Sequence, residues 1–229
     1  MKIIEVFILI YLCCTVLADY WLRNLSKNVI RKFKGTCNQV ALTFDDGPDE
    51  RYTWQLLDLL KKYQVKATFF VITEKVRKSP RLIERMKSDG HVVAMHSLRH
   101  KNELLCFPWE THQEFEKSIQ VFNENKLKIT CYRPPWGHFN LFNYYFAVKN
   151  NMKVVLWTVD AGDWERNKSS EEIFHTLMSK YKPNDIIVLH DSGGARNAPQ
   201  QTIEALKYFI PCCIKKGVEF VTIDEGLGG

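Results

Sequence analysis

Two kinds of segment alternate along the chain: short apolar runs rich in β-forming residues, and longer amphipathic stretches. The apolar runs predict seven strands, at residues 40–44, 67–72, 91–96, 129–133, 154–159, 185–190 and 218–223. The amphipathic stretches predict six helices, at residues 53–63, 80–88, 109–125, 141–149, 171–181 and 199–216. Apolar strands separated by helices indicate parallel βαβ units, so we expect an α/β fold.

Polar side chains that could carry chemistry stand at or just beyond the C-terminal ends of these predicted strands. They are Asp45, Asp46, His96, Arg133, Asp160 and His190. In a barrel the C-terminal strand ends converge on one mouth, where active sites are built. An open doubly wound sheet would spread the same positions along an edge. The pattern therefore favours a (β/α) barrel, made of the seven parallel strands predicted here.

The first residues have the pattern of a signal peptide. Lys2 supplies a positive charge, residues 6–17 are almost all apolar, and residues 16–18 suit a signal peptidase. The apolar run is short for a transmembrane helix, and no second segment of membrane length follows. We expect a signal peptide at residues 1–18 and a secreted protein of the cell wall or cell surface, without a membrane span in the mature chain. An uncleaved N-terminal anchor is the alternative.

The remaining residues, 19–229, are expected to form a single domain. The composition is that of a folded protein, with 45% hydrophobic and 25% charged residues, and no low-complexity linker divides the chain. The formal net charge is +6, and the lysines are scattered along the sequence. This charge is compatible with weak attraction to an anionic wall or membrane surface. Nucleic-acid binding would require a denser basic face, so we do not expect it.

Five cysteines remain after removal of the predicted signal peptide. They are Cys37, Cys106, Cys131, Cys212 and Cys213. An oxidising compartment favours disulfides, and an odd number leaves at least one thiol unpaired. A bridge from Cys37 to Cys212 or Cys213 would tie the two ends of the domain together. The sequence leaves the pairing open.

The first candidate for chemistry is the pair Asp45-Asp46, which ends a predicted strand. Adjacent residues that leave a strand point in different directions, so the two carboxylates can take different roles. Gly47 and Pro48 are typical turn residues and would fix the bend that holds the pair. Taken alone, the segment could equally be a turn or a helix cap that uses one aspartate.

The second candidate is the pair His96 and His100, which follows another predicted strand. Two imidazoles at i and i+4 lie on one face of a helical turn, close enough to share a metal ion. Together with one carboxylate from Asp45-Asp46 they would form a tripod with open positions for water and substrate, as catalytic metal sites require. By itself such a pair is often only polar surface.

Three further segments complete the set. Arg133 could pair with a carboxylate, and the backbone amide near Trp136 could face a developing oxyanion. Asp160 and Trp164 place a carboxylate and an aromatic wall at another strand end, and His190 emerges from an apolar run. Each has an ordinary structural explanation, such as a surface ion pair, a turn or a core histidine. Their joint occurrence at strand ends favours a catalytic site.

In this order, the five segments resemble the motifs of the polysaccharide deacetylases with NodB homology, carbohydrate esterase family 4, which includes chitin deacetylases. The resemblance covers about residues 40–223. It implies a distorted (β/α) barrel. It also implies that Asp46, His96 and His100 bind a divalent metal, zinc first and cobalt as an alternative. Asp45 would be the catalytic base and His190 the catalytic acid.

The resemblance implies supporting roles for five more residues. Arg133 would orient the base, and Asp160 would tune the acid. Trp164 and Leu189 would line the pocket for the acetyl methyl group, and Trp136 would contact the substrate. Trp136 stands where the family usually has tyrosine, and its larger ring is expected to narrow the groove.

These observations predict metal-dependent hydrolysis of N-acetyl groups from an N-acetylglucosamine polymer, chitin first, with release of acetate. The partner expected is therefore an N-acetylated, chitin-like polysaccharide. The main alternative is a catalytically silent relative with a structural or binding role in a wall. An iron oxygenase built on the same tripod would leave Asp45, Arg133 and His190 without roles. A small-molecule amidase of the same superfamily fits poorly with export.

Overall fold

The structure is a computed structural model and describes residues 2–228. Within them, nine strands form one sheet whose ladders are all parallel, in the order β1-β6-β5-β4-β3-β2-β8-β7, with β9 beside β2. The strands are β1 (Val29–Ile30), β2 (Gln39–Asp45), β3 (Thr68–Val71), β4 (Val92–Met95), β5 (Cys131–Tyr132), β6 (Lys153–Val155), β7 (Val159–Asp160), β8 (Ile186–His190) and β9 (Glu219–Phe220).

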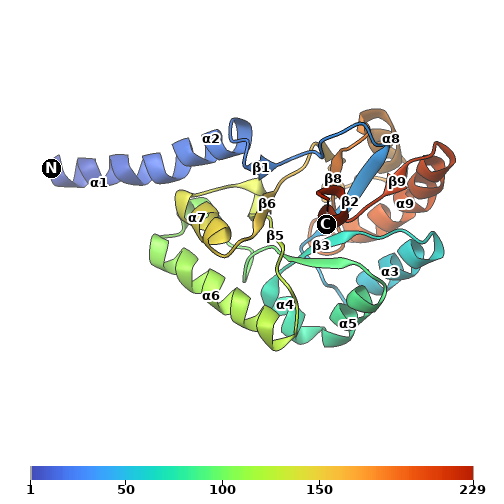
Figure 1. The fold of residues 1–229 in the computed structure, drawn as a ribbon, viewed down its shortest axis with the longest axis horizontal. Coiled ribbons are helices and arrows are strands. Elements are labelled where there is room, and N and C mark those ends of the chain that lie inside the picture. The colour runs from blue at the N-terminus through green and yellow to red at the C-terminus, as the bar shows by residue number, and fades with distance from the viewer. Residues whose placement is uncertain (1, 229) are drawn as a thin grey trace.

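The sheet curls into a distorted barrel, which confirms the predicted fold class (Figure 1). The predicted strand 154–159 divides into β6, which pairs with β5, and β7, which pairs with β8. The two edge strands of the sheet are β1 and β7, and residues 156–158 join β6 to β7. The Leu156 amide donates to Ile30 and the Thr158 amide to Ile186, and these bonds carry the chain across. Each of the seven predicted strands therefore contains a strand of the barrel.

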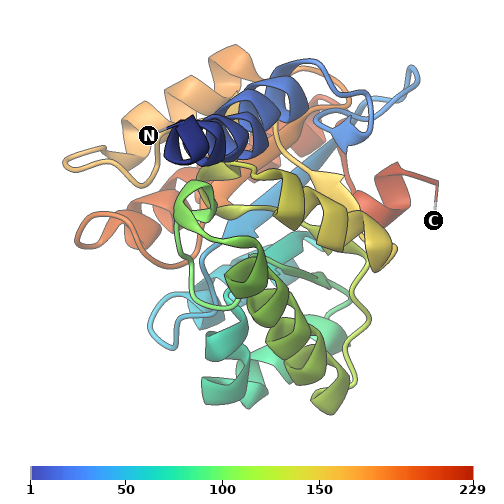
Figure 2. The same ribbon diagram turned by 90° about the vertical axis from the view of Figure 1, so that its left-hand side faces the viewer.

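Helices surround the barrel on its outer side (Figures 1 and 2). They are α3 (Thr53–Lys62), α4 (Thr73–Lys78), α5 (Pro80–Ser88), α6 (Pro108–Glu124), α7 (Leu141–Lys149), α8 (Ser170–Lys180) and α9 (Ala198–Lys215), with the short α10 (Ile223–Gly226) near the C-terminus. Local sequence explains several starts. Pro80 opens α5, Pro108 opens α6, and Ser169 with Glu172 forms a capping box at α8.

Strand alternation separates two hydrophobic cores. Phe44 and Leu189 belong to the larger core, between the sheet and the helices, whereas Ala41 and Phe70 belong to a smaller core. Because successive side chains of a strand point to opposite faces, Asp45 and His190 lie on the face opposite to Phe44 and Leu189. This alternation places the polar strand ends inside the mouth of the barrel.

The N-terminal residues form an almost continuous helix from α1 (Lys2–Leu12) through a π-helical segment (Cys13–Leu17) to α2 (Ala18–Asn24). Residues Ile4–Asn24 are long and apolar enough to cross a membrane, and the helix projects beyond the barrel in Figure 1. The predicted cleavage site falls where α2 begins. Beyond it, Leu22 is buried and the Asp19 carboxylate accepts a hydrogen bond from the Phe139 amide at 2.7 Å. The signal peptide at residues 1–18 stays a prediction, and Met1 lies outside the described residues.

The expected disulfides are wrong for this structure. All seven cysteines are free thiols, and no disulfide occurs within residues 2–228. Cys213 is buried in the core on α9, whereas Cys37 is exposed in the loop before β2. The prediction rested on the oxidising compartment and on the positions of the cysteines in the sequence. In the structure α9 directs Cys213 into the core, where burial raises the pKa of its thiol to about 11.

Candidate active site

A cleft of about 540 Å³ opens at the C-terminal ends of the strands. Its lining brings together four of the five segments that the sequence singled out and part of the fifth. The lining residues are Asp45, Asp46, Ile72, Lys75, His96, His100, Trp136, Trp157, Asp160, Trp164, Val188, His190, Gly193 and Gly194. The convergence expected from a barrel mouth is therefore present.

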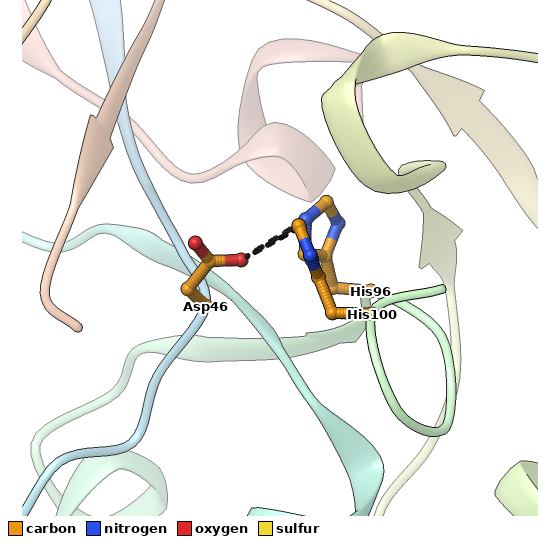
Figure 3. Close-up of side chains that lie close together, drawn as sticks. All are labelled: Asp46, His96 and His100. Carbon is orange, nitrogen blue, oxygen red and sulfur yellow. Dashed lines mark ion pairs between the residues drawn. The ribbon is translucent and has the colours of Figure 1, made fainter. Parts of the chain in front are cut away.

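Asp46, His96 and His100 meet inside this cleft (Figure 3). The Nε2 atom of His100 lies 3.1 Å from Oδ1 of Asp46, and Nε2 of His96 lies 3.5 Å from the same oxygen. One potential ligand atom from each residue falls within 4.8 Å of the others. Asp46 follows β2 directly, and both histidines follow β4, so the ends of two strands on either side of β3 supply the cluster.

The donor set of this cluster fits a divalent metal ion. Oδ1 of Asp46 is buried and has no hydrogen-bond partner among residues 2–228, as expected of an atom directed at an ion. Nδ1 of His96 lies 2.8 Å from the Arg133 carbonyl oxygen, which can only accept. That contact places the proton on Nδ1 and leaves the Nε2 lone pair for a metal. Burial alone would raise the pKa of Asp46, but His100 and His96 hold it well below its usual range.

Asp45 has a different partner. Oδ1 of Asp45 accepts a hydrogen bond of 2.6 Å from Nη1 of Arg133, and both side chains are buried. Arg133 also donates to the Thr43 hydroxyl and to the carbonyls of Val155 and Leu156, and it lies 4.0 Å above the Phe70 ring. The guanidinium is therefore fixed from several sides, and its charge is directed at the Asp45 carboxyl group at the mouth of the barrel.

His190 is held by Asp163 rather than by Asp160. Nδ1 of His190 lies 2.8 Å from Oδ1 of Asp163, while the other carboxylate oxygen accepts from the His190 amide and the Thr202 hydroxyl. Burial alone would lower the pKa of His190, but the charge of Asp163 and its hydrogen bond raise it to about 9. Asp160 lines the cleft and accepts from the Gly162 amide. The sequence analysis expected Asp160 to tune His190, whereas in the structure the neighbouring carboxylate of Asp163 contacts His190.

Two tryptophans flank the cleft. Trp136 is 51% exposed and Trp164 is 48% exposed, so each presents ring surface to an incoming ligand. Trp136 lies 4.2 Å from the His100 ring, and its backbone φ is 53°, an uncommon value for a residue with a side chain. These positions agree with walls of a substrate groove.

Leu189 does not line the cleft. Its side chain is fully buried in the core between sheet and helices, and Val188 lines the cleft instead. The reason is the strand period of two, which places Val188 and His190 on the same face. Arg99, which stands between the two histidines, points away to Glu114 on α6, with its Nη2 atom 2.6 Å from Oε1.

The comparisons with known proteins agree with this geometry. The family described as polysaccharide deacetylase matches residues 32–144. A peptidoglycan-N-acetylglucosamine deacetylase of Bacillus cereus is 34% identical over 188 residues, which cover 81% of this chain and 86% of that protein. The chain belongs to the polysaccharide deacetylase family. A chitooligosaccharide deacetylase of a Bradyrhizobium species is 33% identical over 195 residues, covering 79% of this chain and 86% of that relative.

Solved structures extend the likeness of this polysaccharide deacetylase to three dimensions. The peptidoglycan N-acetylglucosamine deacetylase Bc1960 superposes with a TM-score of 0.81 at 30% identity, covering 87% of this chain and 92% of that one. A pseudoenzyme of the same esterase family from Bacillus anthracis superposes with a TM-score of 0.79 at 26% identity, covering 88% and 69%. The fold alone therefore does not decide between an active and a silent member of the family.

Proposed function

We propose that this deacetylase hydrolyses N-acetyl groups of an N-acetylglucosamine polymer in a metal-dependent reaction and releases acetate. The observation that carries the proposal is the division of roles between two adjacent carboxylates. Asp45 pairs with Arg133, and Asp46 faces His96 and His100. A base and a metal ligand are the two roles that this chemistry asks of them.

Asp46, His96 and His100 would hold the metal, with zinc as the first choice because imidazole and carboxylate ligands suit it. When bound there, a divalent ion polarises an amide carbonyl and acidifies water. Asp45 stays ionised beside Arg133 and takes the proton of the attacking water. The Trp136 backbone amide would support the developing oxyanion.

His190 would donate the proton to the departing amine. Asp163 keeps its imidazole protonated at neutral pH, because the pKa of His190 is about 9. A protonated acid is needed at this step, since an amide nitrogen leaves as a free amine rather than as an anion. Arg133 acts by orienting Asp45, whereas Asp160 is left as part of the cleft wall.

The substrate is proposed to be a glycan chain. Trp136 and Trp164 are about half exposed on the cleft walls, and such rings can pack against sugar faces. Relatives of this chain act on peptidoglycan and on chitooligosaccharides, as their names state. The shared unit is N-acetylglucosamine, and we place chitin and peptidoglycan together as candidate polymers. A cell-wall substrate agrees with the proposed export by a signal peptide at residues 1–18.

The proposal is tested with the purified, zinc-loaded protein. Acetate release is measured on chitooligosaccharides of several lengths and on peptidoglycan, with the chelated protein as control. We expect acetate release from at least one of these substrates, and we expect this release to require the metal. Tight zinc binding without acetate release from any of them would reject the enzyme and favour the silent alternative, a wall protein that binds glycan.

A further inference from the structure

The short helix α4 (Thr73–Lys78) touches both loops that carry the proposed metal ligands. The sequence did not predict this helix. The amide and the hydroxyl of Thr73 each donate to the Ser97 carbonyl at 3.0 Å, and the Glu74 amide donates to the Leu98 carbonyl at 3.1 Å. Ser97 and Leu98 lie between His96 and His100. The first turn of α4 therefore holds the histidine loop.

Lys75, the next residue of the same turn, contacts the loop after β2, which carries Asp46. Its Nζ donates to the main-chain carbonyl of Asp46 at 2.7 Å and to the hydroxyl of Ser192 at 2.6 Å. Ser192 is buried and follows β8, close behind His190. One ammonium group thus joins the loop of the carboxylate ligand to the loop of the proposed acid.

The backbone at these ligands needs such support. Asp46 has a φ of 71°, Ser97 a φ of 92° and His100 a φ of 56°, all in the left-handed region that residues with side chains rarely adopt. Uncommon backbone conformations persist where the surroundings fix them. The Lys75 ammonium group helps to fix the backbone conformation of Asp46, because it donates a hydrogen bond to the carbonyl oxygen of Asp46 itself.

We propose that Lys75 is a positioning residue for the metal site, acting through the Asp46 carbonyl; this inference rests on the proposed metal-dependent function. Electrostatics alone argue the other way, since an ammonium group lining the same cleft repels a divalent cation. Loss of the charge would therefore tighten metal binding. Loss of the hydrogen bonds would loosen the Asp46 turn and weaken binding. The two effects have opposite signs, so one measurement separates them.

The test compares Lys75→Met with the control Lys78→Met, a change at an exposed lysine of the same helix. Zinc affinity is measured by competition with a chromophoric chelator, and the visible spectrum of the cobalt-substituted protein reports ligand geometry. We expect Lys75→Met to bind zinc about 10- to 100-fold more weakly, as for other groups that orient metal ligands, with an altered cobalt spectrum. Lys78→Met should match the wild type, and Lys75→Arg should recover part of the affinity.

Zinc affinity equal to or tighter than wild type in Lys75→Met, with an unchanged cobalt spectrum, would overturn the proposal. Ser192→Ala removes the second partner of Lys75 and gives an independent reading should Lys75→Met fail to fold. A weaker affinity and a shifted spectrum in Ser192→Ala support the proposal, and wild-type values count against it. Failure of the wild-type protein to bind zinc would instead reject the metal-dependent function, so the two failures are distinguishable.

Discussion

Two groups of buried carboxylates in this protein differ in how their charges are balanced. At the barrel mouth, Asp45 meets Arg133 and Asp46 meets two imidazoles. A second group contains Glu103, in the 3₁₀ turn before α6, and Glu114, on α6 itself. Both groups lose the solvation of water on folding, a large cost for an ionised group. Only the first has partners placed to keep each of its carboxylates ionised.

The second group shows what burial does without such partners. Glu103 is 2% exposed, and burial, followed by the charge of Glu114, raises its pKa to about 8. Oε2 of Glu103, the Tyr132 hydroxyl and Oδ1 of Asn143 find no hydrogen-bond partner within residues 2–228. Glu114 is better placed, because Arg99 donates to its Oε1 atom. Glu103 is accordingly a neutral acid at pH 7, whereas the pKa of Asp46 lies well below its usual range.

A buried carboxyl group can therefore serve as a base or a metal ligand only when a fixed partner keeps it ionised. A neutral acid can neither accept a proton from water nor bind a metal. Arg133 supplies this partner from a strand end, so its position is defined by the barrel.

The largest effect is expected for Asp45→Asn. The variant keeps the shape of the side chain but cannot take a proton, so kcat for acetate release should fall by about 10²- to 10⁴-fold. Zinc stoichiometry should stay at that of the wild type, because Asp46 and the histidines are untouched. Glu103→Gln is the matched control from the second group and should leave kcat near that of the wild type. Near-normal turnover in Asp45→Asn would show that Asp45 is not the catalytic base.

The next effect concerns stability. Arg133→Met leaves the Asp45 carboxylate buried without its cation and should lower the free energy of unfolding by about 3–5 kcal/mol. Urea denaturation measures the loss. The double variant Arg133→Met/Asp45→Asn removes both charges and should recover a large part of it. If the double variant is as unstable as the single one, the cause is the lost packing of Arg133 rather than the unpaired buried charge of Asp45.

A pH-dependent effect on stability is expected for Glu103→Gln. Glu103 is protonated in the folded protein up to a pKa of about 8 but ionises near its ordinary value of 4.5 when unfolded. The unfolded state therefore binds fewer protons between these values, and the stability contributed by Glu103 falls as pH rises through this window, by up to about 1.4 kcal/mol per pH unit. Glu103→Gln should remove this slope in urea denaturation from pH 5 to pH 8. An unchanged slope would mean that Glu103 is ionised in the fold.

The smallest change is expected for Asp163→Asn, measured as a shift of a pH profile. Burial lowers the pKa of His190, and without Asp163 only the charges of Asp45 and Asp46 oppose it, so the pKa should fall from about 9. Since the proposed acid must be protonated, the alkaline limb of the kcat profile should move to lower pH. Asp160→Asn serves as control, because the hydrogen-bond partner of His190 is Asp163, whereas Asp160 accepts from the Gly162 amide. Equal profiles for Asp163→Asn and wild type would exclude His190 as the acid.

Much of this architecture follows from sequence pattern. The strand ends predict the barrel and the meeting of one carboxylate of Asp45-Asp46 with His96 and His100, and the resemblance to the family implies that this carboxylate is Asp46. The alternation of side chains along a strand could also have predicted that Val188 lines the cleft, because it places Val188 on the same face of the strand as His190. The choice between Asp160 and Asp163 depends on a turn, and turns follow less regular rules.

The role of Lys75 could not be predicted from the sequence. Its partners Asp46 and Ser192 stand far away along the chain, and α4 is too short to give a clear helical period. The prediction of a disulfide was wrong because it, too, depended on the three-dimensional arrangement of distant residues. Compartment and spacing cannot tell which side of α9 Cys213 occupies, and the fold turns it into the core.

The central claim, metal-dependent deacetylation at the Asp45-Asp46 pair, is tested most directly by titrating the metal-free protein with zinc while acetate release from a chitooligosaccharide or peptidoglycan is followed. The account predicts no release without metal and a rate that rises in proportion to added zinc until each chain holds one ion. A rate that is independent of zinc, or stoichiometric zinc binding with no acetate released, would contradict it.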